Sequence, residues 1–333
     1  MTQENHINPV IDLHCDMPHY LATVPGASPH DKSGIGCAIP YLKQGHVRLQ
    51  IMAISSVENL PDTSITETQI NWFEKLLSDY DGFFKRLDTS HEIGRIVSSE
   101  SVTIVSAIEN ASALCTPDEP LETAFGRLED VIERTGIPLY ISLTHHGENR
   151  FGGGNMTDVG LKGDGRTLLE YISGRKIAID LSHTSDALAR DIIDHIDKKG
   201  LDIAIIASHS NFRVVYNHRR NLPDELAKAI VERGGLIGMN FLRAFMHPDD
   251  AEYLKRHIVY GLELGGIGTL ALGADYFCTA THPDPSRKPF YFEQHEHAGK
   301  YQSMLNSLAP ELDDAAISAL AYGNAMRFME KFA

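Results

Sequence analysis

The sequence contains, near its N-terminus, the stretch Ile11-Asp12-Leu13-His14-Cys15-Asp16, followed by Met17-Pro18. It has the pattern of a short apolar strand that ends in a His-x-Asp pair. Because successive side chains of an extended strand alternate between faces, His14 and Asp16 should point the same way and Cys15 the other way. An imidazole beside a carboxylate is half of a site for a divalent metal ion. Alone, the pair also fits a solvated loop, so the other half must come from the rest of the chain.

Short apolar runs alternate with longer amphipathic stretches along the sequence. The apolar runs predict eight strands, at about 10–14, 47–54, 102–109, 137–144, 176–183, 203–209, 236–241 and 269–275. Helical periodicity and helix-end signals predict helices at about 66–87, 121–134, 165–173, from 184 onward, and at 223–233, 249–264 and 313–331. Near-continuous apolar strands indicate burial on both faces, as in a parallel sheet covered by helices.

Eight such units indicate a closed (β/α)8 barrel, the TIM barrel architecture. No linker or change of composition divides residues 1–333, so we expect a single barrel domain. A doubly wound open sheet is the alternative. It would have a Gly-x-Gly-x-x-Gly turn after the first strand, where His14-Cys15-Asp16 stands instead. In the barrel, Cys15 should pack against the wall, away from the metal.

The composition argues against several classes of partner. The formal net charge is −15, which disfavours binding to nucleic acid or to anionic membranes. No apolar run approaches the roughly 20 residues of a membrane span, and the polar residues 1–6 do not resemble a signal peptide. The four cysteines show no Cys-x-x-Cys spacing, which favours a reduced, cytoplasmic protein.

Histidines and acids gather where the predicted strands end, and the C-terminal ends of the strands carry the active site of a barrel. The candidates are His14, Asp16, Glu109, His145, His146, His183, His209 and Asp275. Such a ring is a ligand set for one or two divalent cations, and zinc fits it best. Any of these residues could instead cap a loop or serve the fold. Because neighbours on an extended chain face opposite ways, only one of His145 and His146 should point inward.

A glycine run follows the fourth predicted strand. Gly152-Gly153-Gly154 lacks the Lys and Ser/Thr of a phosphate-binding loop, so it predicts a flexible lid beside the site.

Eight short motifs fall in one order along residues 12–327. They are Asp12–Pro18, Ile108-Glu109, Leu143-Thr144-His145, Ile179–His183, Ser208-His209-Ser210, Arg220–Asp224, Gly273-Ala274-Asp275 and Gly323–Arg327. Their order and context resemble the membrane dipeptidase (renal dipeptidase) family of the amidohydrolase superfamily. Two departures concern the substrate pocket. Asn110 follows Glu109 where the family has Gly, and Tyr276-Phe277-Cys278 replaces its usual Phe-Asp-Gly. The residues after His145 look more like those of shorter bacterial members.

The resemblance implies a barrel that holds two zinc ions. His14 and Asp16 would bind the first ion and His183 and His209 the second, with Glu109 bridging them.

The resemblance also implies dipeptides as substrates, L-D as well as L-L, and a homodimer. A hydroxide shared by the two ions would attack the peptide carbonyl. His145 would contact the oxyanion, Asp275 would move the proton, and Arg220 would hold the terminal carboxylate. Two alternatives stay open. One is another amidohydrolase reaction: deacylation of an N-acyl amino acid, lactone opening or phosphoester hydrolysis. The other is a non-catalytic metal-binding barrel.

Overall fold

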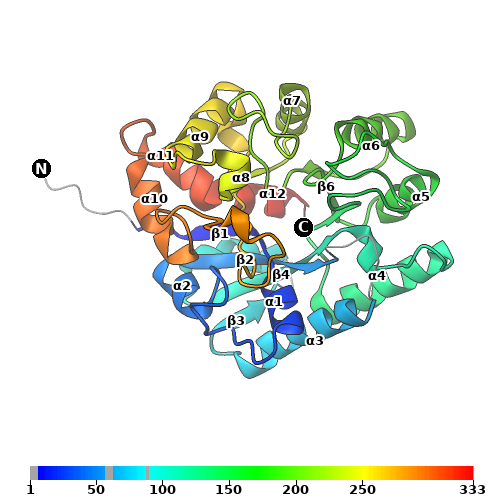
Figure 1. Cartoon of the computed structure of the whole chain (residues 1–333), viewed down its shortest axis with the longest axis horizontal. Helices are drawn as coiled ribbons and strands as arrows, with labels where there is room; N and C mark the ends of the chain where they lie inside the picture. Colours follow the sequence, from blue (N-terminus) through cyan, green and yellow to red (C-terminus); the bar gives the residue numbers. More distant parts are fainter. Residues whose placement is uncertain (1–6, 57–62, 88–89, 333) are drawn as a thin grey trace, which may run out of the picture.

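Parallel strands form the centre of the molecule and helices surround them (Figure 1). The computed structural model describes residues 7–56, 63–87 and 90–332, so the polar residues 1–6 lie outside the described part of the chain. The strands are β1 (Val10–Cys15), β2 (Val47–Ser55), β3 (Phe84–Arg86), β4 (Val102–Glu109), β5 (Tyr140–Ser142), β6 (Ala178–Asp180), β7 (Ile205–Ile206), β8 (Ile237–Met239) and β9 (Leu270–Leu272).

The strands close into a barrel. Their order is β7-β6-β5-β4-β2-β1-β9-β8, and every neighbouring pair is parallel. The two ends of this path meet where Ala207, just after β7, forms a parallel bridge with Ile237 of β8. There the Ala207 N–H donates to the carbonyl of Leu236, and the Gly238 N–H donates to that of Ala207, both at 2.8 Å. The nearly closed parallel sheet confirms the predicted (β/α)8 barrel against the open doubly wound sheet.

The long helices follow the strands as predicted. The α-helices are α1 (Met17–Thr23), α2 (Ile39–Gln44), α3 (Thr63–Asp79), α4 (Leu121–Thr135), α5 (Gly163–Ile172), α6 (Asp186–Lys199), α7 (Asp224–Glu232), α8 (Arg243–Met246), α9 (Tyr253–Glu263), α10 (Tyr301–Ser307), α11 (Asp314–Ser318) and α12 (Asn324–Phe332). A π-helical turn, η6 (Ala319–Gly323), joins the last two helices. Short 3₁₀ turns are η1 (Ser90–Ser98), η2 (Ala111–Ala113), η3 (Gly266–Gly268), η4 (Pro285–Arg287) and η5 (Ala298–Lys300). Across the described ranges, the helices are too short or too polar to cross a membrane.

One helix was predicted to be longer than it is. The periodic pattern predicted a helix from 66 to 87, but α3 ends at Asp79 and the chain forms β3, an extra strand that pairs with β4. Asp81-Gly82 lies between them in a turn closed by the Phe83 N–H on the Tyr80 carbonyl at 2.8 Å. Asp and Gly favour turns over helix interiors, so the local sequence outweighs the apolar spacing.

Two apolar clusters lie on the two sides of the strands. The inner cluster contains Leu13, Val105 and Ala107 together with residues of η1 and α12, while the outer cluster contains helix residues and Cys15. Cys15 is fully buried in the outer cluster, away from the site, as predicted. The pairing of β1 with β2 shifts register between Asp12 and Cys15. Leu13 therefore stays in the inner core although His14, the next residue, faces the site above it.

Glycines bring two strands close to the segment that carries His209. A Cβ added to Gly238 would lie 1.9 Å from the Ser208 carbonyl oxygen, and one added to Gly273 would lie 2.0 Å from the same atom. Only glycine allows this approach without moving backbone. The close packing holds the end of β7 against β8 and β9.

Candidate metal centre

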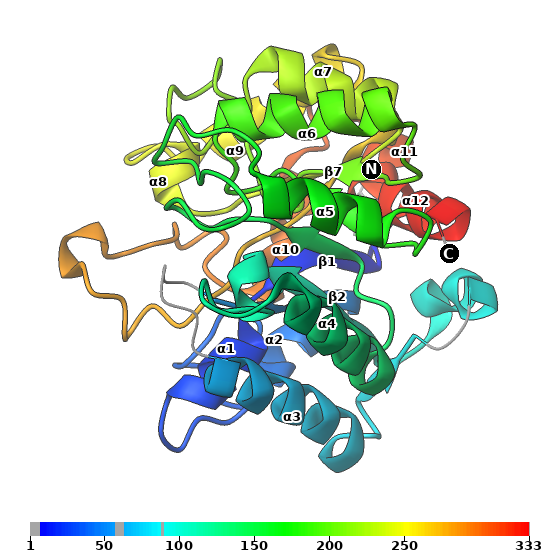
Figure 2. The same cartoon turned by 90° about the vertical axis from the view of Figure 1, so that its right-hand side faces the viewer.

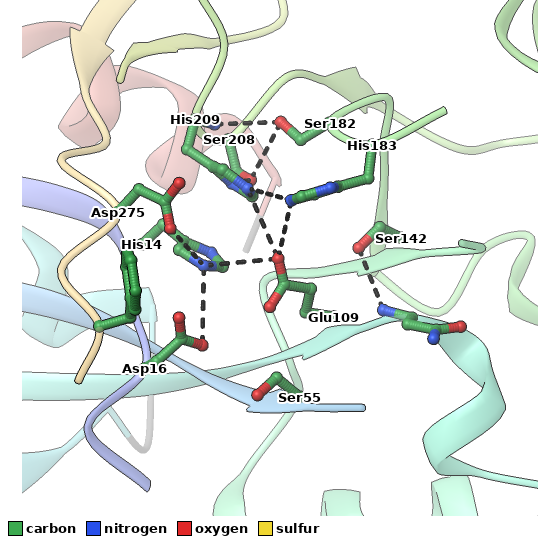
Figure 3. A network of polar contacts seen from close by, with 12 residues as sticks. His14, Asp16, Ser55, Glu109, Ser142, Ser182, His183, Ser208, His209 and Asp275 are labelled. Atoms are coloured by element: carbon green, nitrogen blue, oxygen red, sulfur yellow. Dashed lines mark hydrogen bonds and ion pairs between the residues drawn. The ribbon is translucent and has the colours of Figure 1, made fainter. Parts of the chain in front are cut away.

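Side chains from the ends of three strands converge on Glu109, at the end of a fourth (Figure 3). The Oε1 atom of Glu109 lies 3.1 Å from Nε2 of His183, 3.6 Å from Nε2 of His209 and 3.7 Å from Nε2 of His14. The Nε2 atoms of His183 and His209 are 3.0 Å apart. Three imidazoles thus point one nitrogen each at a single carboxylate.

His14 also faces two further carboxylates. Its Nε2 atom lies 3.9 Å from Oδ1 of Asp16 and 3.7 Å from Oδ1 of Asp275. The strand-end residues predicted to gather are therefore brought together, although they lie up to 261 positions apart in the sequence.

Four overlapping groups of possible metal ligands occur in and beside the cluster in the described structure, and two of them share Glu109. In the group His14, Asp16 and Glu109, and again in Glu109, His183 and His209, the ligand atoms lie within 4.8 Å of one another. Within the described structure, the buried atoms His14 Nε2 and Asp16 Oδ1 have no hydrogen-bond partner. Buried polar atoms without partners are costly, and a cation between them removes that cost. Nitrogen and carboxylate donors in this arrangement fit a pair of zinc ions.

The electrostatics of the cluster favour a bound cation. Burial lowers the pKa of His14 to about 3 and holds the pKa values of His183 and His209 well below the ordinary value. The rings are therefore neutral, which is the form that binds metal. Burial and repulsion among the carboxylates raise the pKa values of Asp16 and Glu109 well above the ordinary values. A divalent ion is the opposite charge that these carboxylates lack.

Tyr140 on β5 sets the orientation of His14. Its hydroxyl lies 2.6 Å from His14 Nδ1 and donates to the carbonyl of Leu13 at 3.1 Å. Because the hydroxyl has one proton, used on Leu13, it accepts the proton of Nδ1. The lone pair of His14 Nε2 is then left facing the site, which is how second-shell partners orient metal-binding histidines.

Asp180 and Ser208 fix His209 in the same way. Ser208 donates its hydroxyl proton to Asp180 Oδ2 at 2.7 Å, and its oxygen lies 2.7 Å from His209 Nδ1. The hydroxyl therefore accepts from Nδ1, and His209 Nε2 is free for metal.

We expect Tyr140→Phe to weaken zinc binding by about 10–100-fold, the usual effect of losing a second-shell partner. The change removes one oxygen from a fully buried ring and keeps its shape. The affinity is measured by competition with a chromophoric chelator. Tyr171→Phe, at a half-buried tyrosine that contacts Glu129, is the matched control and should bind zinc like the wild type. Equal affinities in the two variants would contradict the role of Tyr140.

A cavity of about 420 Å³ opens above the cluster. Its lining residues are Asp16, His19, Glu109, His145, His146, His183, Leu242, Phe245, Asp275, Phe277, Cys278, Thr281, His282, Pro283 and Arg287. Both His145 and His146 line it, so the expectation that only one would point inward was wrong. The chain bends at residues 145–147 instead of staying extended, and strand alternation does not apply there.

Comparisons with known proteins identify the family of this chain. Residues 4–333 match the sequence profile of the family described as membrane dipeptidase, peptidase family M19. The chain belongs to the membrane dipeptidase family. This confirms the resemblance and places the chain in a family of metal-dependent hydrolases.

Individual relatives are distant. An uncharacterised protein from the 5′ region of pqqA in Klebsiella pneumoniae is 32% identical over 143 residues, covering 38% of this chain and 51% of the relative, so about half of that relative is matched. An uncharacterised dipeptidase of Schizosaccharomyces pombe is 24% identical over 304 residues, which cover 80% of this chain and 69% of the relative. One solved structure is a metallopeptidase from Rhodobacter sphaeroides, liganded with a phosphinate mimic of the dipeptide L-Ala-D-Ala. It superimposes with a TM-score of 0.83 at 19% identity, and the match covers 98% of this chain and 100% of that chain. This last likeness supports the fold.

The departure from the dipeptidase family at Asn110 is accommodated by hydrogen bonds. Asn110 has a φ of 70°, a conformation suited to glycine. Its side-chain amide donates to the Ser56 carbonyl at 2.7 Å, and its side-chain oxygen accepts from the Ser112 N–H at 3.1 Å and from Asn149 Nδ2 at 2.9 Å. His183 and Asp275 share the positive φ, with values of 68° and 64°. Strain of this kind, of order 1–3 kcal/mol per residue, gathers at functional sites.

Arg220 lies beside the cavity and does not line it. It is 3% exposed; Nη1 donates to Ser210 Oγ at 2.8 Å and Nη2 to the His209 carbonyl at 3.1 Å. Its guanidinium carbon is 5.5 Å from the ring of Phe245, which does line the cavity. In the described structure its Nε has no hydrogen-bond partner. Arg220 therefore supports the strand end that carries His209.

Asn240 is a site residue that the sequence reasoning missed. Its side-chain amide donates to Asp275 Oδ2 at 2.8 Å and to the carbonyl of His209 at 3.2 Å. Burial raises the pKa of Asp275 to about 7. Asn240 comes directly after β8, but the strand was predicted to run to residue 241, and only acids and histidines were considered at strand ends.

Proposed function

We propose that the protein is a dizinc dipeptidase. The observation that carries the proposal is the pair of three-residue ligand groups that share Glu109 at the floor of a cavity, in a chain that belongs to the membrane dipeptidase family. His14 and Asp16 would hold one ion, His183 and His209 the other, and Glu109 both. Bound there, the ions would supply a hydroxide nucleophile at neutral pH and polarise the peptide carbonyl.

Three side chains would act on the substrate. His145 lines the cavity with its ring 4.3 Å from that of His183, so it can donate to the oxyanion that develops on the carbonyl. Asp275 lies 3.7 Å from His14 with its other oxygen held by Asn240, so one carboxylate oxygen is directed to pass a proton from the nucleophile to the leaving amine.

The third is Arg220, which would bind the carboxylate at the end of the dipeptide. Its buried Nε has no hydrogen-bond partner in the described structure, and its guanidinium carbon lies 5.5 Å from the ring of Phe245, which lines the cavity. A charge-assisted hydrogen bond to a terminal carboxylate would favour substrates of two residues, because a longer peptide places that charge elsewhere. The dipeptide mimic bound by the Rhodobacter sphaeroides protein has a D-residue second, which supports tolerance of that stereochemistry here.

Metal analysis together with a substrate panel tests this proposal. We expect two zinc ions per chain, loss of activity on chelation and recovery when zinc is restored. The panel contains L-L and L-D dipeptides, N-acetyl amino acids, a lactone and a phosphotriester, which separates the dipeptidase from the other amidohydrolase reactions. Zinc-loaded protein that cleaves no dipeptide would refute the substrate assignment. Less than one bound metal per chain would favour the non-catalytic barrel.

A further inference from the structure

One continuous segment forms the outer wall of the cavity. We call residues 276–291, which follow β9, the outer loop. It contributes the lining residues Phe277, Cys278, Thr281, His282, Pro283 and Arg287. In Figure 2 this segment is orange and projects on the left, on the side where α8 also lies. The floor of the cavity holds the metal-binding groups, so the outer loop faces the parts of a substrate that lie away from the metals.

Arg287 has the only permanent positive charge among the described residues that line the cavity. Its Nη1 atom is 3.5 Å from Nε2 of His282, and its guanidinium carbon is 5.6 Å from the centre of the Phe290 ring. None of the ion pairs found within residues 7–56, 63–87 and 90–332 involves it. A guanidinium presents five N–H donors in a planar fork, and here that fork has no carboxylate partner from the described chain.

Among the described residues, Arg287 forms no ion pair with the acids that line the cavity. Hydrogen bonds from Ser286 and, as a smaller cause, the charge of Arg287 lower the pKa of Asp284, an exposed acid of the same loop that does not line the cavity. The acidic lining residues are Asp16, Glu109 and Asp275, and all three contact His14 at the floor. Arg287 lines the same cavity as these acids, so its charge faces the reaction centre from the outer wall. A partly desolvated cation that faces a binding cavity favours an anionic ligand group.

We propose that Arg287 binds a side-chain carboxylate on the C-terminal residue of the substrate, so that the preferred dipeptides end in Asp or Glu. The inference rests on the proposed dipeptidase function. In that reaction Asp275 delivers a proton to the leaving amine, so the residue that carries this amine lies beside Asp275. Its main-chain carboxylate is assigned to Arg220. The side chain of this C-terminal residue is the substrate group still without a partner on the Asp275 side of the cavity. Arg287 is the cation that faces it.

Matched substrates test the proposal, because Asp and Asn differ in charge and hardly in shape. We expect the wild type to cleave Ala-Asp with a kcat/KM at least tenfold above that of Ala-Asn. In Arg287→Gln the ratio of the two values should fall by about 10–100-fold, the effect of losing a charge-assisted pair. Arg287→Lys should keep part of the preference, because the charge remains while the bidentate fork is lost.

Lys288→Gln is the matched control. It removes one positive charge from the next residue of the outer loop, which lines a neighbouring cavity, and should leave the ratio unchanged. A preference for Asp-Ala over Asn-Ala would place the charged side chain on the first residue and overturn the proposal. So would an Arg287→Gln variant that loses discrimination between Ala-Ala and its C-terminal amide, because the guanidinium would then bind the main-chain carboxylate.

Failure of this inference can be told from failure of the proposed function. If zinc-loaded protein cleaves neutral dipeptides but shows no preference for Ala-Asp over Ala-Asn, the assignment of Arg287 is wrong and the dipeptidase stands. If it cleaves neither neutral nor acidic dipeptides, both are wrong.

Discussion

Replacing His209 with alanine is expected to remove bound zinc and nearly all activity. His209 is fully buried, and its Nε2 atom lies 3.0 Å from that of His183 and 3.6 Å from Glu109. Loss of a second-shell partner already weakens metal binding 10–100-fold, so loss of the ligand itself should exceed that range. The same result is expected for His183→Ala. Zinc per chain is measured by elemental analysis after dialysis against a weak chelator, and kcat/KM on a neutral dipeptide accompanies it.

His195→Ala is the control for these two variants. His195 lies on α6 next to Glu170, outside the cluster, so its removal should change neither metal content nor activity. Circular dichroism and melting temperature show whether each variant remains folded. If both His183→Ala and His209→Ala keep two zinc ions per chain, the assignment of ligands is wrong.

Replacing Asp275 with asparagine should reduce kcat by about 10²–10⁴-fold while zinc content stays at two per chain. Asparagine has nearly the shape of aspartate but cannot carry the proton to the leaving amine. Its oxygen can still accept the hydrogen bond from Asn240, which lies 2.8 Å away in the wild type. Steady-state kinetics and elemental analysis on the same preparation give both quantities.

The metal measurement distinguishes two roles for this residue. Asp275, His14 and His209 also form a group whose ligand atoms lie within 4.8 Å of one another. Loss of one zinc in Asp275→Asn would therefore make Asp275 a ligand and not the proton carrier. Asp284→Asn, at an exposed acid on the outer loop, is the control and should keep both zinc and kcat.

The barrel could be predicted because its strands are buried on both faces and its helices are amphipathic. Those two patterns are local, so eight units could be counted along the chain. Where a turn signal competes with periodicity, as at Asp81-Gly82, counting fails and α3 ends early. The short helices α1, α2, α8 and α10 were missed because four to seven residues hold too little periodicity to recognise.

The metal-binding residues could also be predicted, since a parallel barrel brings the C-terminal ends of its strands to one rim. Finding the residues at this rim requires only knowing which residue ends each strand. This approach does not reach Tyr140, whose hydroxyl meets His14 from the first residue of β5, or Arg287, which lies twelve residues beyond Asp275. The partners of such side chains depend on loop geometry and on packing between distant strands.

Under the proposed function, the outer loop would let substrate preference change independently of the metal centre. Residues 276–291 leave the sheet after β9 and supply six of the residues that line the cavity, while the candidate metal ligands come from other strand ends. Exchanging this one segment between relatives would therefore change the outer wall and leave the metal floor in place. Under the proposed function, selection would act in the same way, altering which dipeptides are taken without rebuilding the metal-binding floor.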